Sequence, residues 1–235
     1  MAINKKITNT KTIGSKIIVG LDEAGRGPVL GPLVMAALAV KEENIKKLEW
    51  LGVKDSKLLS AEVREELFGR IREVVEDFRV EMIEPDAIDL SVDGGTSNLN
   101  WLEADTSARM ISELNPDVII VDCPSPNIPA YKNYFSSRLS KAVREKAQLI
   151  VEHKADVNYM AAAAASIVAK VIRDRQIEHL KSEIGIDFGS GYMSDPKTKE
   201  FLKKHYKTHP HLFRKSWQSY KNVEAAANQK KLGEF

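Results

Sequence analysis

Short, almost unbroken apolar runs recur along the chain, and this pattern is typical of strands that are covered on both faces of a sheet. The clearest are residues 17–21 and 117–122. A longer run at residues 32–40 is expected to pair with the first through a glycine-rich turn. Two shorter segments, residues 79–83 and 148–156, are also predicted as strands. The pattern therefore predicts five strands.

Longer segments between these runs repeat their apolar residues with a helical period. In residues 60–78 the apolar positions recur at three- and four-residue spacing, and Ser60 can cap the helix. Further helices are predicted at residues 101–114, at residues 131–147, at residues 159–180 and from residue 197 onward. Because the strands come first and then alternate with helices, this order indicates an α/β or α+β domain with a mixed central sheet.

Composition narrows the class of protein. The 235 residues are 43% hydrophobic and 29% charged, which is ordinary for a folded globular protein with one substantial core. The apolar stretch at residues 160–169 is too short to span a membrane, and the N-terminus has no signal-peptide core. A single cysteine, Cys123, excludes an internal disulfide framework. We therefore expect a cytoplasmic protein without membrane contact.

Positive charge gathers near the C-terminus, although the net charge is only +2. From Lys197 onward, ten Lys and Arg residues face three Glu residues. Such a segment suits contact with a polyanion, and it equally suits a solvated helix face followed by a tail. We divide the chain into a disordered lead-in, a main domain, a helical C-terminal segment and a flexible tail, at residues 1–15, 16–190, 191–223 and 224–235.

Acidic residues stand at the ends of three predicted strands. Asp22 and Glu23 end the first strand, Asp122 ends the strand at residues 117–122, and Asp156 ends the last one. If these strand ends are neighbours, the carboxylates converge, and a pair of Mg²⁺ or Mn²⁺ ions would relieve their repulsion. Two such ions can support hydrolysis of a phosphodiester. The spacing alone also fits a second interpretation, in which each Asp only caps or turns the chain.

Four longer motifs carry a resemblance to a known family. They are GLDEAGRGPVLGP at residues 20–32, VKDSKLLS at residues 53–60, EHKADVNYMAAAAASIVAKVIRD at residues 152–174 and GSGYMSDP at residues 189–196. In this order they closely resemble archaeal ribonuclease HII, the type 2 ribonuclease H, over about residues 17–220. The resemblance implies a ribonuclease H-like fold, in which helices flank a mixed five-stranded sheet and a helical C-terminal segment follows.

The resemblance also implies an activity. Members of the family are metal-dependent endoribonucleases that cut the RNA strand of RNA–DNA hybrids and single ribonucleotides embedded in duplex DNA, leaving 5′-phosphate and 3′-hydroxyl ends. Matched to the family, the four catalytic acids and metal ligands fall on Asp22, Glu23, Asp122 and Asp156. These are the four residues that the strand ends selected.

A set of substrate contacts follows from the same resemblance. The loop that matches Gly25, Arg26 and Gly27 distinguishes a ribonucleotide in this family, where the 2′-hydroxyl can both donate and accept a hydrogen bond. Tyr192 matches the residue that packs on the sugar at an RNA-to-DNA junction. Four further matching residues are expected to contact the phosphate backbone or to support the acids, namely Lys57, Ser166, Lys170 and Arg173.

The last residues indicate a candidate protein partner. Gln229, Leu232 and Phe235 have the spacing of the short motif with which replication and repair proteins bind the ring-shaped sliding clamp, the proliferating cell nuclear antigen. Leu232 and Phe235 would share one face of a helical turn. The motif is degenerate, and this tail has one aromatic residue where two are common. We expect a monomer with the clamp as a candidate partner.

Two other functions compete with cleavage. A non-catalytic protein that binds hybrids or is tethered to the clamp would be favoured if any of the four acids were replaced, and all four are present. A nucleotide-binding switch would use GRGPVLG as a phosphate loop, but no Lys followed by Ser or Thr comes after these glycines. We therefore favour the endoribonuclease.

Overall fold

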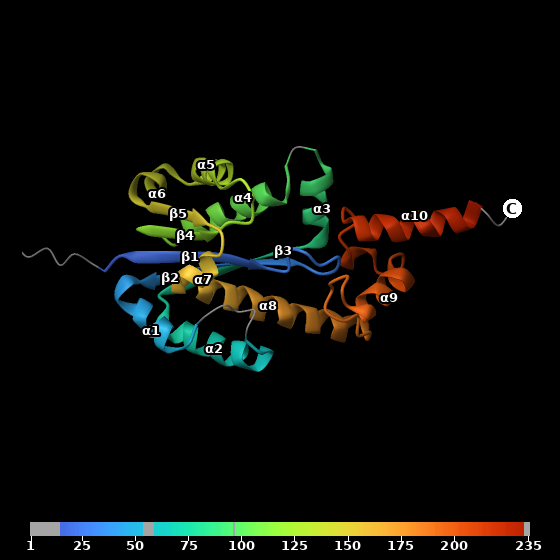
Figure 1. Cartoon of the computed structure of the whole chain (residues 1–235), viewed down its shortest axis with the longest axis horizontal. Coiled ribbons are helices and arrows are strands. Elements are labelled where there is room, and N and C mark those ends of the chain that lie inside the picture. Colours follow the sequence, from blue (N-terminus) through green and yellow to red (C-terminus); the bar gives the residue numbers. More distant parts are fainter. Residues whose placement is uncertain (1–14, 54–58, 96, 233–235) are drawn as a thin grey trace, which may run out of the picture.

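The computed structural model describes residues 15–53, 59–95 and 97–232. Its centre is one five-stranded sheet with the strand order β3-β2-β1-β4-β5 (Figure 1). The sheet is mixed, because β1 runs antiparallel to β2 and parallel to β4. The strands are β1 (Ile17–Ala24), β2 (Leu33–Lys41), β3 (Asp77–Ile83), β4 (Val118–Asp122) and β5 (Gln148–Glu152).

Helices cover both faces of this sheet (Figure 1). One face carries α1 (Ile45–Trp50), α2 (Ala61–Val74) and the long helix α8 (Met160–Ile184). The other face carries α3 (Pro85–Asp93), α4 (Leu99–Ser112), α5 (Ile128–Arg138) and α6 (Lys141–Lys146). Alternate residues of a strand therefore enter two different cores, which explains why the apolar runs are unbroken.

The start of α8 lies directly on β1. A Cβ atom added at Gly20 would stand 2.1 Å from the carbonyl carbon of Ala161, so only glycine permits this approach. The alanines from Ala161 to Ala165 are all buried, and their small side chains let the helix axis stay close to the sheet. The packing places the polar residues further along α8 beside the end of β1.

The C-terminal segment forms a third core at one end of the sheet. It contains α9 (Pro196–His205), a 3₁₀ turn η3 (Pro210–Leu212) and α10 (Gln218–Leu232), which extends away from the sheet (Figure 1). This core includes Val29 and Leu30 from the loop after β1. Val29 donates its N–H to the carbonyl of Gly191 at 3.0 Å, and Arg214 donates its N–H to the carbonyl of Val29 at 2.9 Å. The loop after β1 is thus held by the C-terminal segment.

The fold predicted from the resemblance, a mixed five-stranded sheet flanked by helices with a helical C-terminal segment, is confirmed. Some element boundaries differ from the prediction. The helix predicted at residues 60–78 ends at Val74, because the following residues pair with β2 as β3. The helix predicted at residues 131–147 is two helices, since Leu139 is extended and Ser140 caps α6.

The structure also differs from the prediction in the last strand and in the tail. β5 ends at Glu152, and Asp156 lies in the short helix α7 (Ala155–Asn158). Helix α10 continues to Leu232, so residues 224–232 are helical where a flexible tail was expected. Their Ala, Glu, Gln and Lys residues are good helix formers, and Val223 and Ala227 pack against the third core.

Some predictions fall outside the described residues, namely those on residues 1–14, on Lys57 and on Phe235. No helix in the described part of the chain has both the length and the apolar character that crossing a bilayer requires.

Candidate active site

Three of the four predicted acids meet at one end of the sheet. Asp22 lies in β1, and Asp122 is the last residue of β4, the parallel neighbour of β1. Asp156 comes from α7, the helix that follows β5. One carboxylate oxygen from each of the three lies within 4.8 Å of the other two. The sequence predicted this convergence on the condition that the strand ends are neighbours; β1 and β4 are neighbours, and the turn after β5 adds Asp156.

The turn that carries Asp156 has a distinctive backbone. Lys154 adopts a left-handed conformation with φ of 61°, which turns the chain from β5 into α7. The N–H of Ala155 then donates to Oδ1 of Asp122 at 3.0 Å. This hydrogen bond links the end of β4 to the start of α7 and thereby keeps Asp122 close to Asp156.

The acidic cluster is an unfavourable arrangement for a protein without a cation. Asp22 is 8% exposed and Asp156 is 2% exposed. Burial raises the pKa of Asp22 well above its usual value, and the charges of Glu23 and Asp122 raise that pKa further. Ser166 and the N–H of Glu23, which donates to Asp22 Oδ1 at 2.8 Å, act in the opposite direction. Buried oxygen ligands without His or Cys suit a hard divalent ion such as Mg²⁺ or Mn²⁺.

Glu23 lies beside this cluster and is not one of the three convergent residues. Successive residues of a strand point to opposite faces of a sheet. Glu23 accordingly lines a small cavity together with Glu103 and Tyr131, on the face covered by α4 and α5. It also lines the open cleft that contains Asp22 and Asp122. Glu23 is therefore close enough to raise the pKa of Asp22 and sits at the rim of the cluster.

The loop at Gly25, Arg26 and Gly27 forms one wall of the same cleft. Gly25 has φ of +84°, and a Cβ atom added to it would stand 2.9 Å from the carbonyl oxygen of Pro32. The guanidinium of Arg26 forms an ion pair with Glu103 and donates to Oδ1 of Asn100 at 2.5 Å. The side chain of Arg26 is thus directed toward α4.

A second arginine holds the backbone of this loop. Arg214 is completely buried, and its guanidinium donates to the carbonyl oxygens of Gly25 at 2.6 Å, Arg26 at 2.9 Å and Gly31 at 2.9 Å. The indole of Trp217 lies 5.0 Å from the guanidinium of Arg214 and donates to the carbonyl of Gly27 at 3.2 Å. Burial lowers the pKa of Arg214 to about 10, so the group stays charged at neutral pH.

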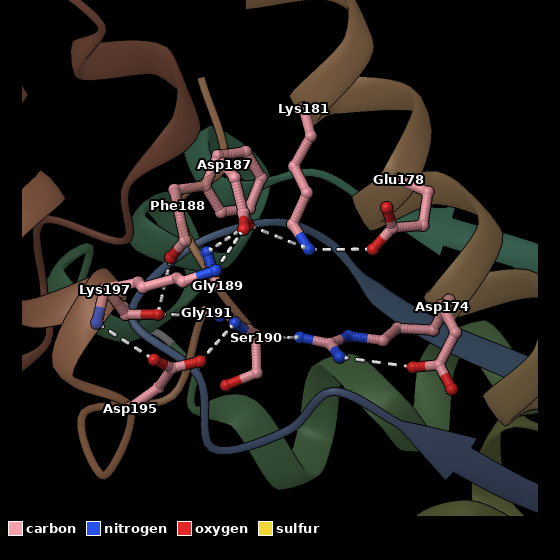
Figure 2. Close-up of polar contacts among 12 residues, drawn as sticks. Asp174, Glu178, Lys181, Asp187, Phe188, Gly189, Ser190, Gly191, Asp195 and Lys197 are labelled. Carbon is pink, nitrogen blue, oxygen red and sulfur yellow. Dashed lines mark hydrogen bonds and ion pairs between the residues drawn. The ribbon is translucent and has the colours of Figure 1, made fainter. Parts of the chain in front are cut away.

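Tyr192 also lines the cleft, on a loop that is extensively hydrogen-bonded. Asp195 accepts hydrogen bonds from the N–H groups of Ser190 at 2.7 Å and Lys197 at 2.9 Å (Figure 2). Thr198 accepts from the N–H of Gly191 at 3.0 Å. A Cβ atom added at Gly27 would stand 3.6 Å from the ring of Tyr192, so the two loops meet at the cleft.

The residues predicted on α8 occupy different depths. Ser166 and Lys170 line the cleft, and Ser166 is hydrogen-bonded to Asp22. Lys170 also pairs with Asp174 at 3.2 Å. Arg173 is only 3% exposed and lies behind Tyr192, with its guanidinium 5.3 Å from the ring centroid and a 2.5 Å hydrogen bond to the carbonyl of Ser190. Arg173 therefore supports the Tyr192 loop from below.

Two charged residues at this site were not selected from the sequence, namely Glu103 and Arg214. Glu103 lies in the helix predicted at residues 101–114, but this position does not separate it from a solvated acid. Arg214 lies in the basic C-terminal region, where most Lys and Arg residues are exposed. Only the burial of their side chains distinguishes these two residues from solvated charged residues.

The comparisons with known proteins agree with one another. The family model described as Ribonuclease HII matches residues 19–220. The ribonuclease HII of Pyrococcus furiosus is 41% identical over 217 residues, which cover 91% of this chain and 94% of that relative. The structure of ribonuclease H2 from Pyrococcus horikoshii is similar with a TM-score of 0.80 and 39% identity, covering 89% of this chain and 98% of that one.

The chain is also similar to ribonuclease HII from Archaeoglobus fulgidus, which has been solved in complex with the sliding clamp PCNA. The likeness has a TM-score of 0.76 and 38% identity, and it covers 88% of this chain and 96% of that one.

The sheet order, the flanking helices and the converging acids define a nuclease of the ribonuclease H-like class. Within that class, the chain belongs to the ribonuclease HII family. It is accordingly a type 2 ribonuclease H, an endoribonuclease that acts on RNA–DNA hybrids.

Proposed function

We propose that the protein cuts both RNA–DNA hybrids and single ribonucleotides embedded in duplex DNA, by a two-metal mechanism that leaves 5′-phosphate and 3′-hydroxyl ends. The observation that carries this proposal is the convergence of Asp22, Asp122 and Asp156 within 4.8 Å, beside an open cleft that Asp22 and Asp122 line. A duplex laid across this cleft would bring a phosphodiester close to these carboxylates.

Asp22, Asp122 and Asp156 would hold the divalent ions, with Glu23 at the rim as a fourth ligand. When bound, Mg²⁺ or Mn²⁺ would activate a water molecule and stabilise the leaving oxygen of the scissile bond. The role of the protein is to orient the carboxylates. Ser166 and the N–H group of Glu23 hydrogen-bond to Asp22 and oppose the rise in its pKa, and the N–H group of Ala155 hydrogen-bonds to Asp122.

The two loops that meet at the cleft would read the sugar on either side of the cleavage site. The backbone groups of Gly25, Arg26 and Gly27 can approach a ribose closely, because two of the three residues carry no side chain. The 2′-hydroxyl would exchange hydrogen bonds with these groups. The ring of Tyr192, which is 37% exposed, would pack on the neighbouring deoxyribose, while Lys170 would contact a phosphate.

Cleavage of a DNA duplex that contains one ribonucleotide tests this function directly. We expect cleavage with Mg²⁺ or Mn²⁺, none with a chelator, and 3′-hydroxyl ends that a DNA polymerase can extend. An all-DNA duplex and an RNA–DNA hybrid are the matched substrates. Cleavage that persists in the chelator would contradict the metal mechanism, and an enzyme that cuts only the hybrid would contradict the embedded-ribonucleotide activity.

The variant Asp122→Asn tests the acidic cluster independently of the rest of the site. A neutral amide cannot replace a charged metal ligand, so the variant should lose nearly all cleavage and still bind the hybrid. Hydrolysis and hybrid binding are measured on the same preparation. Activity near that of the wild type at saturating Mg²⁺ would remove Asp122 from the ligand set.

We further propose that the C-terminal end of the chain binds the sliding clamp. The ribonuclease HII of Archaeoglobus fulgidus, whose fold this chain shares, has been solved in complex with PCNA. In this chain Gln229 is exposed on α10, the helix that extends away from the sheet (Figure 1), so an attached clamp would lie away from the sheet.

Calorimetry with a purified archaeal clamp tests this partner. Substituting Gln229, Leu232 and Phe235 together with Ala should abolish the binding heat and leave cleavage of short duplexes unchanged. Glu224→Ala, in the same helix and also exposed, is the control and should bind as the wild type does. Equal binding by the triple variant would place the contact elsewhere, and no binding heat with the wild type would exclude the contact.

A further inference from the structure

The most unusual charged residue outside the acidic cluster is Glu103 of α4. It is 1% exposed, and it lines a small cavity together with Tyr131, Asp22 and Asp122. One of its oxygens, Oε1, has no hydrogen-bond partner among the described residues. Burial raises the pKa of Glu103 to about 7, while the neighbouring charge of Arg26 acts in the opposite direction. A buried carboxylate of this kind is poorly explained by stability, because an apolar residue of similar size would serve the core as well.

The partner of Glu103 explains its position. Arg26 reaches from the loop after β1 to α4, where one terminal nitrogen pairs with Glu103 and the other donates to Asn100 at 2.5 Å. Glu103 and Asn100 are three residues apart on the helix and therefore face the same way. Both ends of the guanidinium fork are held by one rigid helix, which is itself packed on the sheet.

The same loop is fixed from its other side by Arg214, which binds the carbonyl oxygens of Gly25 and Arg26. Between these two contacts, the peptide groups from Gly25 to Gly27 have little freedom to move. Because the terminal nitrogens of Arg26 are committed to α4, this side chain serves as an anchor and is not a free ligand for phosphate.

We propose that Glu103, assisted by Asn100, is a positioning residue that acts through Arg26 to hold the Gly25–Gly27 peptide groups where they read the ribonucleotide. This inference deepens the proposed function and rests on the role given there to that loop. Substrate recognition then explains why a carboxylate is buried here despite its energetic cost. An apolar residue at position 103 should preserve the fold and impair recognition of the substrate.

Glu103→Leu is the central test, measured on an RNA–DNA hybrid with Mg²⁺. Losing one charge-assisted anchor should lower kcat/KM about tenfold, mainly through KM. Thermal unfolding should be unchanged or shifted upward, and binding of Mn²⁺ measured by calorimetry should match the wild type. Asp105→Asn is the matched control, because Asp105 lies on the same helix and pairs at 2.6 Å with Arg138 on the surface, away from the cleft.

A mutant cycle distinguishes positioning through Arg26 from a purely structural role. Arg26→Leu should lower kcat/KM by a similar factor, and the double variant Glu103→Leu/Arg26→Leu should be no worse than either single change. If Arg26→Leu fails to fold because it leaves Glu103 unpaired, Asn100→Ala is measured in its place. Asn100→Ala should also raise KM, by a smaller factor than Glu103→Leu does.

Three results would overturn the inference. The first is an unchanged KM in Glu103→Leu, and the second is a loss that adds fully to that of Arg26→Leu. The third is a loss of Mn²⁺ binding, which would place Glu103 among the groups that serve the metal site. Because all measurements use the hybrid, a wild type that fails on an embedded ribonucleotide would contradict the proposed function without affecting this test.

Discussion

Replacing Asp22 with Asn should stabilise the metal-free protein and abolish its activity. Asp22 is 8% exposed and lies within 4.8 Å of carboxylate oxygens of Asp122 and Asp156. Its pKa is raised by burial and then by the charges of Glu23 and Asp122. Asn keeps the shape and can still accept a hydrogen bond through its amide oxygen, so the substitution removes the charge with little other change.

The expected gain follows from the spacing of the charges. Two unit charges 4.8 Å apart repel by about 3.5 kcal/mol at an effective dielectric constant of about 20. Partial protonation and the nearby Lys170 reduce this repulsion, so we expect a net gain in the free energy of unfolding of about 2 to 3 kcal/mol near pH 8. For a chain of this length, such a gain raises Tm by roughly 4 to 12 °C.

The gain should depend on pH in one direction. A carboxyl group whose pKa is raised in the folded state favours folding fully below the pKa of unfolded Asp, about 3.9, and loses this contribution as pH rises through the raised pKa. The difference in stability between Asp22→Asn and the wild type should therefore be small near pH 4 and grow toward pH 8. Addition of Mg²⁺ or Mn²⁺ should stabilise the wild type and leave the variant almost unaffected.

Thermal and urea unfolding of chelator-treated proteins at several pH values measures this effect. Asp105→Asn is the control, since its exposed ion pair with Arg138 is worth at most about 1 kcal/mol. A metal-free Asp22→Asn protein that is less stable than the wild type at pH 8 would refute the electrostatic reasoning. So would equal stabilisation of both proteins by Mn²⁺.

Three further variants test other parts of the structure. Tyr192→Ala should lower cleavage at a single embedded ribonucleotide roughly tenfold to a hundredfold, because ring stacking contributes about 1 to 3 kcal/mol, while calorimetry should show unchanged Mn²⁺ binding. Arg214→Met should lower the free energy of unfolding in urea by about 3 to 5 kcal/mol, since buried carbonyl oxygens lose their donor; a loss below about 1 kcal/mol would mean that water replaces the guanidinium. Gly20→Ala should cost at least about 3 kcal/mol in the same assay, because its Cβ would stand 2.1 Å from the Ala161 carbonyl carbon, and an unchanged midpoint would show that α8 can move away from the sheet.

Much of the architecture could be predicted from local pattern. The apolar runs of β1, β2 and β4 identified strands buried on both faces, and the acids at the ends of β1 and β4 indicated where a site would form. The pattern was weaker where tertiary pairing competes with helical periodicity. The helix predicted to residue 78 gives way to β3 after Val74, because β2 offers hydrogen-bond partners that an isolated helix end cannot match.

The sequence by itself determined the residue types that the chemistry needs and their order along the chain. Asp22, Glu23, Asp122 and Asp156 were selected from strand ends, and the glycines beside Arg26 marked a loop built for close approach. These inferences were possible because strand ends, turns and carboxylate chemistry depend on neighbouring residues. They required no knowledge of which helix lies against which strand.

Only the tertiary structure decided how these residues are held. Asp156 joins the cluster from α7, beyond the end of β5, because Lys154 turns the chain. Arg26 finds its partner Glu103 at a sequence distance of 77 residues, and Arg214 binds carbonyl groups up to 189 residues away. In the sequence, neither Glu103 nor Arg214 can be distinguished from a charged residue that is exposed to solvent. Burial and pairing across such distances are properties of the packed chain, because the energy of a charge depends on what surrounds it in space.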